Sequence, residues 1–121
     1  MQRFTDLKVW QRAHKLVLEI YTATKTFPAD ERFGLTSQIR RAATSVPTNI
    51  AEGSKRRRRN DFAHFLNIAE GSLAETEYLV ILSHDLEHLT AKKSQGMLAE
   101  IEEIGAMLHS LRQRVESRAD P

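Results

Sequence analysis

The chain has 121 residues, of which 40% are hydrophobic and 28% are charged, and it contains no cysteine. That length supports a single hydrophobic core, so residues 1–121 are predicted to form one domain. The absence of cysteine excludes a disulfide framework and Cys-based zinc or redox chemistry. Residues 1–6 lack an apolar signal core and no apolar run approaches membrane-spanning length, so we expect a cytoplasmic protein without membrane contact.

The formal net charge is only +2, but the charges are unevenly distributed along the chain. Residues 36–60 contain seven cations and one acid, whereas residues 61–121 contain five cations and eleven acids. Any surface that binds anions is therefore expected to be local, because the molecule as a whole is nearly neutral.

The first predicted helix begins after Thr5 or Asp6, because either side chain can cap the free backbone N–H groups of a helix start. It ends near Phe27-Pro28, since the residue before a proline avoids the helical region, and residues 29–33 form a short link. Apolar residues at spacings of three and four predict its buried face. That face comprises Leu7, Trp10, Ala13, Val17, Ile20 and Thr24.

The second predicted helix ends at Gly53, a residue type favoured just beyond a helix C-terminus. Pro47 lies inside this helix, where it removes one backbone hydrogen bond and crowds the carbonyl of Ala43, so we expect a kink. The alternative is two shorter helices, with Pro47 opening the second. The predicted buried face comprises Leu35, Ile39, Ala42, Val46 and Ile50.

The third predicted helix is the longest, and Asn60 or Asp61 is expected to cap it. Its apolar face contains two lines of residues, which one partner helix could not cover. The width of this face therefore favours a homo-oligomer. Gly71 within it costs about 1 kcal/mol relative to alanine, which indicates a close neighbour or a local bend. The first line comprises Phe62, Phe65, Ala69, Ser72, Thr76, Leu79, Ser83 and Leu86, and the second comprises Leu66, Leu73 and Val80.

The fourth predicted helix follows a link at residues 90–94 and carries the most regular apolar seam of the chain. Short connections between four helices favour antiparallel neighbours, so the predicted fold is all-α, an antiparallel up-down-up-down four-helix bundle. Trp10, Tyr21 and the phenylalanines are expected to lie in its core. The seam comprises Met97, Ile101, Ile104, Leu108, Leu111 and Val115.

Five adjacent cations connect the second and third predicted helices: Lys55, Arg56, Arg57, Arg58 and Arg59. Five adjacent charges cannot all be buried, so this run is a solvated corner. Three interpretations remain open, namely a corner that prevents aggregation, contacts to nucleic-acid phosphates, and docking of a protein partner. No aromatic residue interrupts the run, so a base-stacking platform is not indicated.

Four further polar residues lie on the second predicted helix. Arg40 and Arg41 either pair with acids of the third helix, such as Glu75 or Glu77, or extend the basic surface. Asn49 and Glu52 lie one turn apart near Pro47, and they are expected to satisfy local backbone groups.

Two patterns resemble metal sites, but neither is complete. The segment His84–His88 fits H-x-x-E-H, a metalloprotease pattern that places two imidazoles one helical turn apart. Such a site needs a third ligand and a substrate chamber, and too little chain follows to build them. Asp61-x-x-His64 and Asp85-x-x-His88 look like di-metal half-sites, but 24 residues of helix separate them by roughly 36 Å. We therefore predict no metal, no cofactor and no catalytic residue.

Two segments carry a family resemblance. The first is residues 38–53, Gln-Ile-Arg-Arg-Ala-Ala-Thr-Ser-Val-Pro-Thr-Asn-Ile-Ala-Glu-Gly. The second comprises Phe62, Phe65, Leu66, Ile68, Ala69, Gly71 and Ser72, followed by Glu75 and Glu77. Together with Asp6-Leu7, Val9-Trp10-Gln11 and Phe27-Pro28, they resemble the four-helix-bundle proteins encoded in intervening sequences of bacterial 23S rRNA genes. The resemblance covers about residues 4–90.

The resemblance implies a left-handed four-helix bundle that assembles as a ring, typically a homopentamer, with a nucleic-acid role and no known catalysis. The fold is also similar to the accessory protein of diversity-generating retroelements, in which a basic ring surface engages nucleic acid and a reverse transcriptase. Within the family motifs fall Arg40, Arg41, Asn49, Glu52, Glu75 and Glu77.

These observations favour a non-enzymatic, homo-oligomeric helical bundle that binds RNA or DNA through Lys55–Arg59, with Arg40 and Arg41 as further candidates. The alternative is a structural adaptor that binds a protein partner.

Overall fold

The structure, a computed structural model, describes residues 3–120, which form four α-helices and two short 3-10 helices. The short helix η1 spans Phe4–Asp6 and precedes α1, which spans Lys8–Thr24. The short helix η2 spans Ala29–Glu31, and α2 spans Leu35–Ser54. Helix α3 spans Arg59–Asp85, and α4 spans Ala91–Glu116. The predicted all-α four-helix fold is confirmed. Residues 1 and 2, part of the segment without a signal core, lie outside the described residues.

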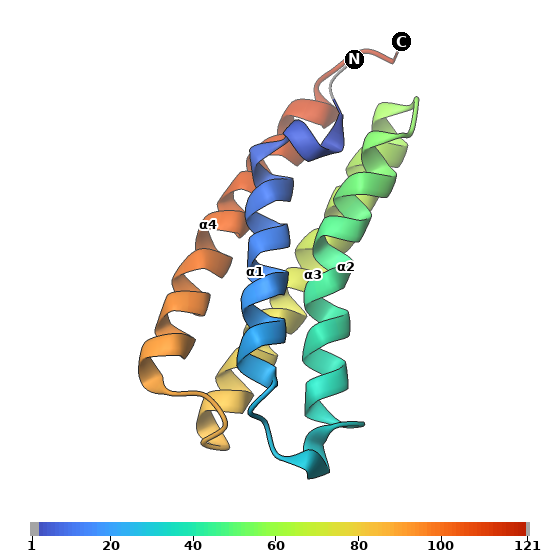
Figure 1. The fold of residues 1–121 in the computed structure, drawn as a ribbon. Helices are drawn as coiled ribbons and strands as arrows, with labels where there is room; N and C mark the ends of the chain where they lie inside the picture. The colour runs from blue at the N-terminus through green and yellow to red at the C-terminus, as the bar shows by residue number, and fades with distance from the viewer. Residues whose placement is uncertain (1–2, 121) are drawn as a thin grey trace.

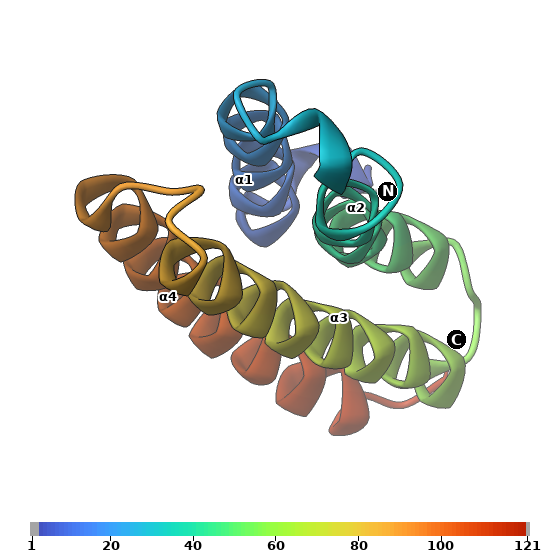
Figure 2. The same cartoon turned by 90° about the horizontal axis from the view of Figure 1, so that it is seen from below.

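Successive helices run in opposite directions in Figure 1, and short links join them at the two ends of the bundle. Helix α1 lies beside α2 and α4 lies beside α3 in the end-on view of Figure 2. The α2–α3 pair packs most extensively, and the α1–α4 pair packs least. The α2–α3 connection and both chain ends lie at the same end of the bundle (Figure 1). This end therefore gathers the cationic connector with the start of α1 and the end of α4.

The core consists of the apolar faces that the helical spacing predicts. All six seam residues of α4 and all five predicted residues of α2 are buried. Ile39 and Ile104 are at most 1% exposed, and Leu66 and Leu108 are fully enclosed. Within the described chain, no helix is both long and apolar enough to cross a membrane.

Several predicted helix boundaries are wrong. Helix α3 begins at Arg59 and not after Asn60 or Asp61, because the carboxylate of Asp120 accepts a hydrogen bond from the backbone N–H of Arg59 at 2.8 Å. Helix α4 begins at Ala91, because the Thr90 hydroxyl caps it by accepting from the N–H of Lys93 at 3.2 Å.

Helix α1 ends at Thr24, three residues before the predicted stop. The chain turns there because the N–H of Phe27 bonds to the carbonyl of Thr24 at 3.1 Å, and the Phe27 side chain then enters the core. At its start neither Thr5 nor Asp6 is the cap; that position belongs to Leu7, which follows η1.

Of the two glycines singled out from the sequence, Gly53 has a different role from the one predicted, and for Gly71 the predicted local bend stays a prediction. Gly53 lies inside α2, where a Cβ atom would come within 2.7 Å of the Cβ of Phe65 and 2.9 Å of the Cδ1 of Phe62. It permits close approach of α2 and α3 and is not a C-terminal cap. A Cβ at Gly71 would meet nothing within 4 Å, so no neighbour in this chain requires glycine there. Helix α2 is continuous across Pro47, so the alternative of two shorter helices is wrong, and the kink stays a prediction.

The apolar face of α3 is covered within the single chain. Both α2 and α4 pack on α3, and together they bury most of its two predicted lines. The width of this face therefore no longer argues for an oligomer. The prediction that Trp10, Tyr21 and the phenylalanines lie in the core is wrong for two of them, because Tyr21 is 41% exposed and Phe33 is 89% exposed.

Candidate nucleic-acid interface

The basic corner, Lys55–Arg59, connects α2 to α3 at the end of the bundle that holds both chain termini (Figure 1). Lys55 follows the last turn of α2, and Arg58 precedes the first turn of α3. Lys55, Arg56, Arg57 and Arg58 are exposed, whereas Arg59 is half-buried. The solvated corner predicted from the sequence thus extends over four residues, and the fifth belongs to the helix.

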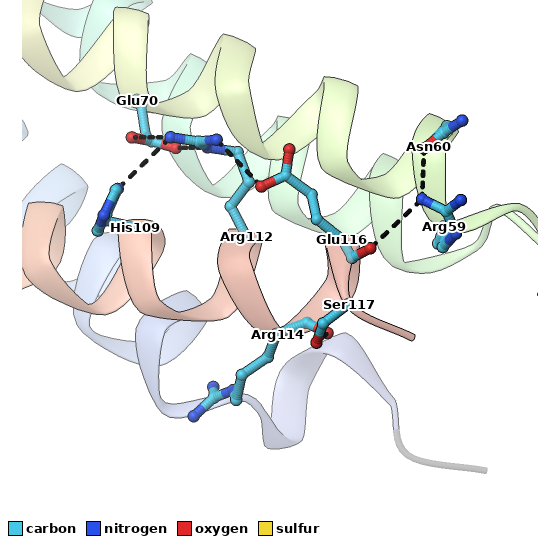
Figure 3. Close-up of polar contacts among 8 residues, drawn as sticks. All are labelled: Arg59, Asn60, Glu70, His109, Arg112, Arg114, Glu116 and Ser117. Carbon is cyan, nitrogen blue, oxygen red and sulfur yellow. Dashed lines mark hydrogen bonds and ion pairs between the residues drawn. The ribbon is translucent and has the colours of Figure 1, made fainter. Parts of the chain in front are cut away.

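Arg59 is committed to the end of α4. Its Nη1 donates to the side-chain oxygen of Asn60 at 2.9 Å and to the backbone carbonyl of Glu116 at 3.3 Å (Figure 3). The C-terminal end of a helix carries partial negative charge on its free carbonyls, so a cation there is favourable. Arg59 therefore links α3 to α4, and part of its hydrogen-bonding capacity is used in this contact.

Lys55 and Arg56 rest on aromatic rings. The Nζ of Lys55 lies 5.9 Å from the ring centroid of Phe4, and the guanidinium carbon of Arg56 lies 4.8 Å from that of Phe65. A cation over a ring face is attracted by the ring quadrupole, by about 0.5–1 kcal/mol at exposed sites. These contacts orient the two cations and leave their donor groups open to an anion.

Arg57 and Arg58 are the least engaged cations of the corner. Both are exposed, and within residues 3–120 neither guanidinium forms a hydrogen bond or an ion pair. Arginine presents a planar fork of donors that suits phosphate oxygens. These two side chains thus have neither a ring contact nor a hydrogen-bond partner within residues 3–120.

The other two predicted arginines lie elsewhere on the molecule. Arg40 contacts α1, where its Nε donates to the hydroxyl of Thr24 at 2.8 Å and its guanidinium carbon lies 4.5 Å from the ring centroid of Tyr21. Arg41 is exposed beside Glu75, but no ion pair joins either arginine to Glu75 or Glu77 in the described chain. Arg40 lies about 22 Å from Lys55 along α2 at 1.5 Å per residue, so the structure does not bring these arginines into the corner.

The remaining motif residues serve packing or face solvent. Asn49 donates to the carbonyl of Ser45 at 2.8 Å, as the sequence predicts for a side chain that satisfies local backbone. The Ser45 hydroxyl lies 2.8 Å from that of Ser72, which links α2 to α3. Glu52 is exposed on α2, and Glu75 and Glu77 are both exposed on α3.

The histidines and acids of the two metal-site patterns do not come together in the structure. Helix α3 ends at Asp85, so His84 lies in the helix while His88 lies in the loop beyond it. The expected pair of imidazoles on one helix face is therefore wrong. His88 instead places its Nε2 3.1 Å from a carboxylate oxygen of Glu31. In the part of the chain that the structure describes, no group of three or more metal-ligating side chains occurs.

Two arginines outside the corner are held by carboxylates. Arg12 donates from Nε and Nη2 to both carboxylate oxygens of Glu100, each at 2.8 Å, which raises the pKa of Arg12 and lowers the pKa of Glu100. Arg112 bonds to Glu70, which raises the pKa of Arg112, and it also reaches Glu116 at 3.3 Å (Figure 3). Because their carboxylate partners neutralise these cations, they differ from Arg57 and Arg58.

The sequence did not reveal two features of this end. Phe4 and Phe65 lie under Lys55 and Arg56, although neither aromatic residue is next to them in the chain. The contact from Arg59 to the end of α4 joins residues 57 positions apart. No local pattern in the sequence signals either one, because both depend on how the helices pack.

Fold and surface together define a small four-helix bundle with a cationic connector at one end. The chain matches the model of the 23S rRNA-intervening sequence protein family over residues 5–110, and it therefore belongs to that family. A search among curated proteins finds no match.

A solved structure of similar fold comes from Bacteroides thetaiotaomicron VPI-5482 and is described as a protein with unknown function from the S23 ribosomal protein family. It is 28% identical to this chain, with a TM-score of 0.80, and the match covers 86% of this chain and 97% of that one. The resemblance noted in the sequence is thus confirmed at the level of family and fold.

Proposed function

We propose that this protein is a non-enzymatic nucleic-acid-binding bundle whose basic corner contacts RNA or DNA phosphates. The observation that carries the proposal is the pair Arg57 and Arg58, exposed and without ion pairs within residues 3–120, while Arg12 and Arg112 are held by carboxylates. Contacts to phosphates release condensed counterions, so binding weakens as salt rises and is largely independent of sequence.

The test compares two variants that each remove two positive charges, from opposite ends of the bundle. Arg57→Ser with Arg58→Ser removes the free cations of the corner, and serine at position 58 is a favourable helix cap, so the fold should persist. The control, Lys92→Ser with Lys93→Ser, removes two exposed cations from the first turn of α4. Binding of a labelled duplex is measured by fluorescence anisotropy at several salt concentrations.

The corner variant should bind more weakly, and the slope of log K against log salt should flatten by about 1.8, since each phosphate contact contributes about 0.9 for duplex DNA. The control variant should keep the slope of the unmodified protein. Equal slopes in both variants would refute the corner as the site.

We also propose that the protein forms a homo-oligomeric ring, a pentamer by resemblance, which would multiply the corner and convert weak contacts into avidity. Support comes from the outer face of α3, where Tyr78 is 59% exposed and Ala74 is exposed, while Gly71 has open space beside it. Small residues beside an exposed aromatic ring leave room for a second helix to approach closely.

Size-exclusion chromatography with light scattering measures the assembly directly. Tyr78→Lys should lower the oligomer mass, whereas Phe33→Lys, which charges an exposed aromatic position outside α3, should leave it unchanged. A monodisperse monomer of the unmodified protein at micromolar concentration would exclude the ring.

A protein-binding adaptor is the second candidate, and the 89% exposed side chain of Phe33 favours it because aromatic residues are enriched at protein–protein interfaces. A partner captured by the tagged protein after nuclease treatment and a high-salt wash, and lost in Phe33→Ser, would favour the adaptor over the nucleic-acid role.

A further inference from the structure

A groove of about 590 Å³ runs between α1 and α2, beside the basic corner. Its lining is mostly apolar and includes four aromatic rings, which we call the aromatic groove: Phe4, Trp10, His14 and Tyr21. Positions 10, 14 and 21 recur at helical spacing and share one face of α1, while Phe4 comes from η1. The fold thus assembles a row of rings that the sequence scatters over eighteen positions.

Three of the rings form a column. The rings of Trp10 and His14 are stacked with centroids 5.0 Å apart and planes 9° apart, and Phe4 meets Trp10 edge-on at 5.2 Å. His14 is exposed and Trp10 is half-buried, so the column ends in solvent. An exposed flat ring such as that of His14 is a surface on which an unpaired base can stack.

Both ends of the groove are marked by a cation on an aromatic face. Lys55 of the basic corner lies over Phe4, at 5.9 Å, and Arg40 lies over Tyr21, at 4.5 Å. Glu52 is the acidic side chain of the lining, and because it is exposed, solvent and salt screen its repulsion of a phosphate. Aromatic faces between two cations match a chain that alternates bases with phosphates.

We propose that the aromatic groove binds an unpaired strand of nucleic acid whose backbone continues onto the basic corner. This inference rests on the proposed function and makes it specific: the ligand is single-stranded. A duplex hides its base faces in its own stack, whereas every base of a single strand has a free face. Trp10 to Tyr21 spans about 17 Å of helix, which is long enough for several unpaired nucleotides.

In this arrangement Arg40 also contacts the nucleic acid, although it lies too far from the basic corner to be part of it. It holds the far end of the groove, so Arg40 and Lys55 contact the same strand without being neighbours. The sequence argument against a base-stacking platform concerned the run Lys55–Arg59 alone, whereas the rings of the aromatic groove come from α1 and η1.

Trp10 is the single tryptophan of the chain, so its fluorescence reports directly on the groove. Oligothymidylate, which stays unpaired, is titrated into the unmodified protein and compared with a duplex of equal length. We expect oligothymidylate to quench Trp10 emission and to bind more tightly than the duplex, and the duplex to bind through the corner with little quenching.

Two variants and one control test the stacking. Tyr21→Leu and His14→Leu keep apolar bulk at exposed positions but remove the flat ring, and each should weaken oligothymidylate binding roughly tenfold while leaving duplex binding unchanged. Phe33→Leu removes an exposed ring outside the groove and should change neither affinity. Circular dichroism establishes that all three variants remain folded.

The outcomes separate this inference from the proposed function. In one outcome, binding depends on Arg57 and Arg58 but is equally tight for single strand and duplex, and Trp10 emission is not quenched. That result overturns the proposed role of the aromatic groove and leaves the role of the basic corner intact. Absence of salt-sensitive binding to either probe overturns both. A lower oligomer mass for Tyr21→Leu in light scattering, with unchanged oligothymidylate affinity, assigns the groove to contact between copies and overturns the inference.

Discussion

Gly53 controls how closely α2 and α3 can approach next to the basic corner, and Gly53→Ala tests that role. The added Cβ would lie 2.7 Å from the Cβ of Phe65 and 2.9 Å from the Cδ1 of Phe62. The Cβ of Phe65 is fixed to the backbone of α3, so the closer of these clashes cannot be relieved by a side-chain rotation. The two helices must move apart by several tenths of an ångström, in the most extensively packed pair of the bundle.

Two effects of opposite sign decide the magnitude. Overpacking of this kind costs about 1–3 kcal/mol, whereas alanine in a helix interior gains about 1 kcal/mol over glycine. The expected net loss is up to about 2 kcal/mol, and at roughly 4 °C per kcal/mol for a domain of this size the melting temperature should fall by up to about 8 °C.

The matched control is Gly96→Ala in α4, where a Cβ would meet nothing within 4 Å. This variant carries only the helix-propensity gain, so it should raise stability by about 0.5–1 kcal/mol. Both are measured by thermal and urea unfolding followed by circular dichroism. A Gly53→Ala variant as stable as Gly96→Ala would refute the close approach of α2 and α3.

Three further predictions concern single contacts. Arg59→Ser should cost about 0.5 kcal/mol in urea unfolding, because it removes the cation at the C-terminal end of α4, and a loss equal to that of Arg57→Ser would contradict the assignment. Thr36→Val should be neutral or stabilising by about 1 kcal/mol, because the buried Thr36 hydroxyl has no hydrogen-bond partner within residues 3–120. Thr76→Val should be destabilising, because the Thr76 hydroxyl donates to the carbonyl of Ser72 at 2.8 Å; the same sign in both threonine variants would be inconsistent with this difference. Since Arg12 lowers the pKa of Glu100, their contact stabilises the fold above the ordinary glutamate pKa of about 4.3. That contribution should disappear as pH falls through the lowered folded value, and unfolding of Glu100→Gln should lack this pH dependence; identical profiles would rule it out.

Periodicity was sufficient for most of the fold. The seam of α4 and the buried face of α2 are correct residue by residue, because burial on one side of a helix imposes spacings of three and four wherever the chain has no competing interaction. The residues at which helices begin were less predictable. Helix starts moved because a capping partner lies nearby in space, as Asp120 does for Arg59, and sequence spacing does not show such partners.

Of the candidate site, the sequence by itself determined that the run Lys55–Arg59 must lie in solvent, since adjacent charges cannot be buried together, and four of its five residues are exposed. Only the tertiary structure decided that the five cations are unequal. Arg59 is held by α4, Lys55 and Arg56 rest on Phe4 and Phe65, and the guanidinium groups of Arg57 and Arg58 face solvent. The free-energy cost of burying a charge depends on the residue itself, so it can be inferred from the sequence. The ring or helix end that a cation contacts belongs to another helix, so it cannot. Those neighbours exist only once the bundle has packed.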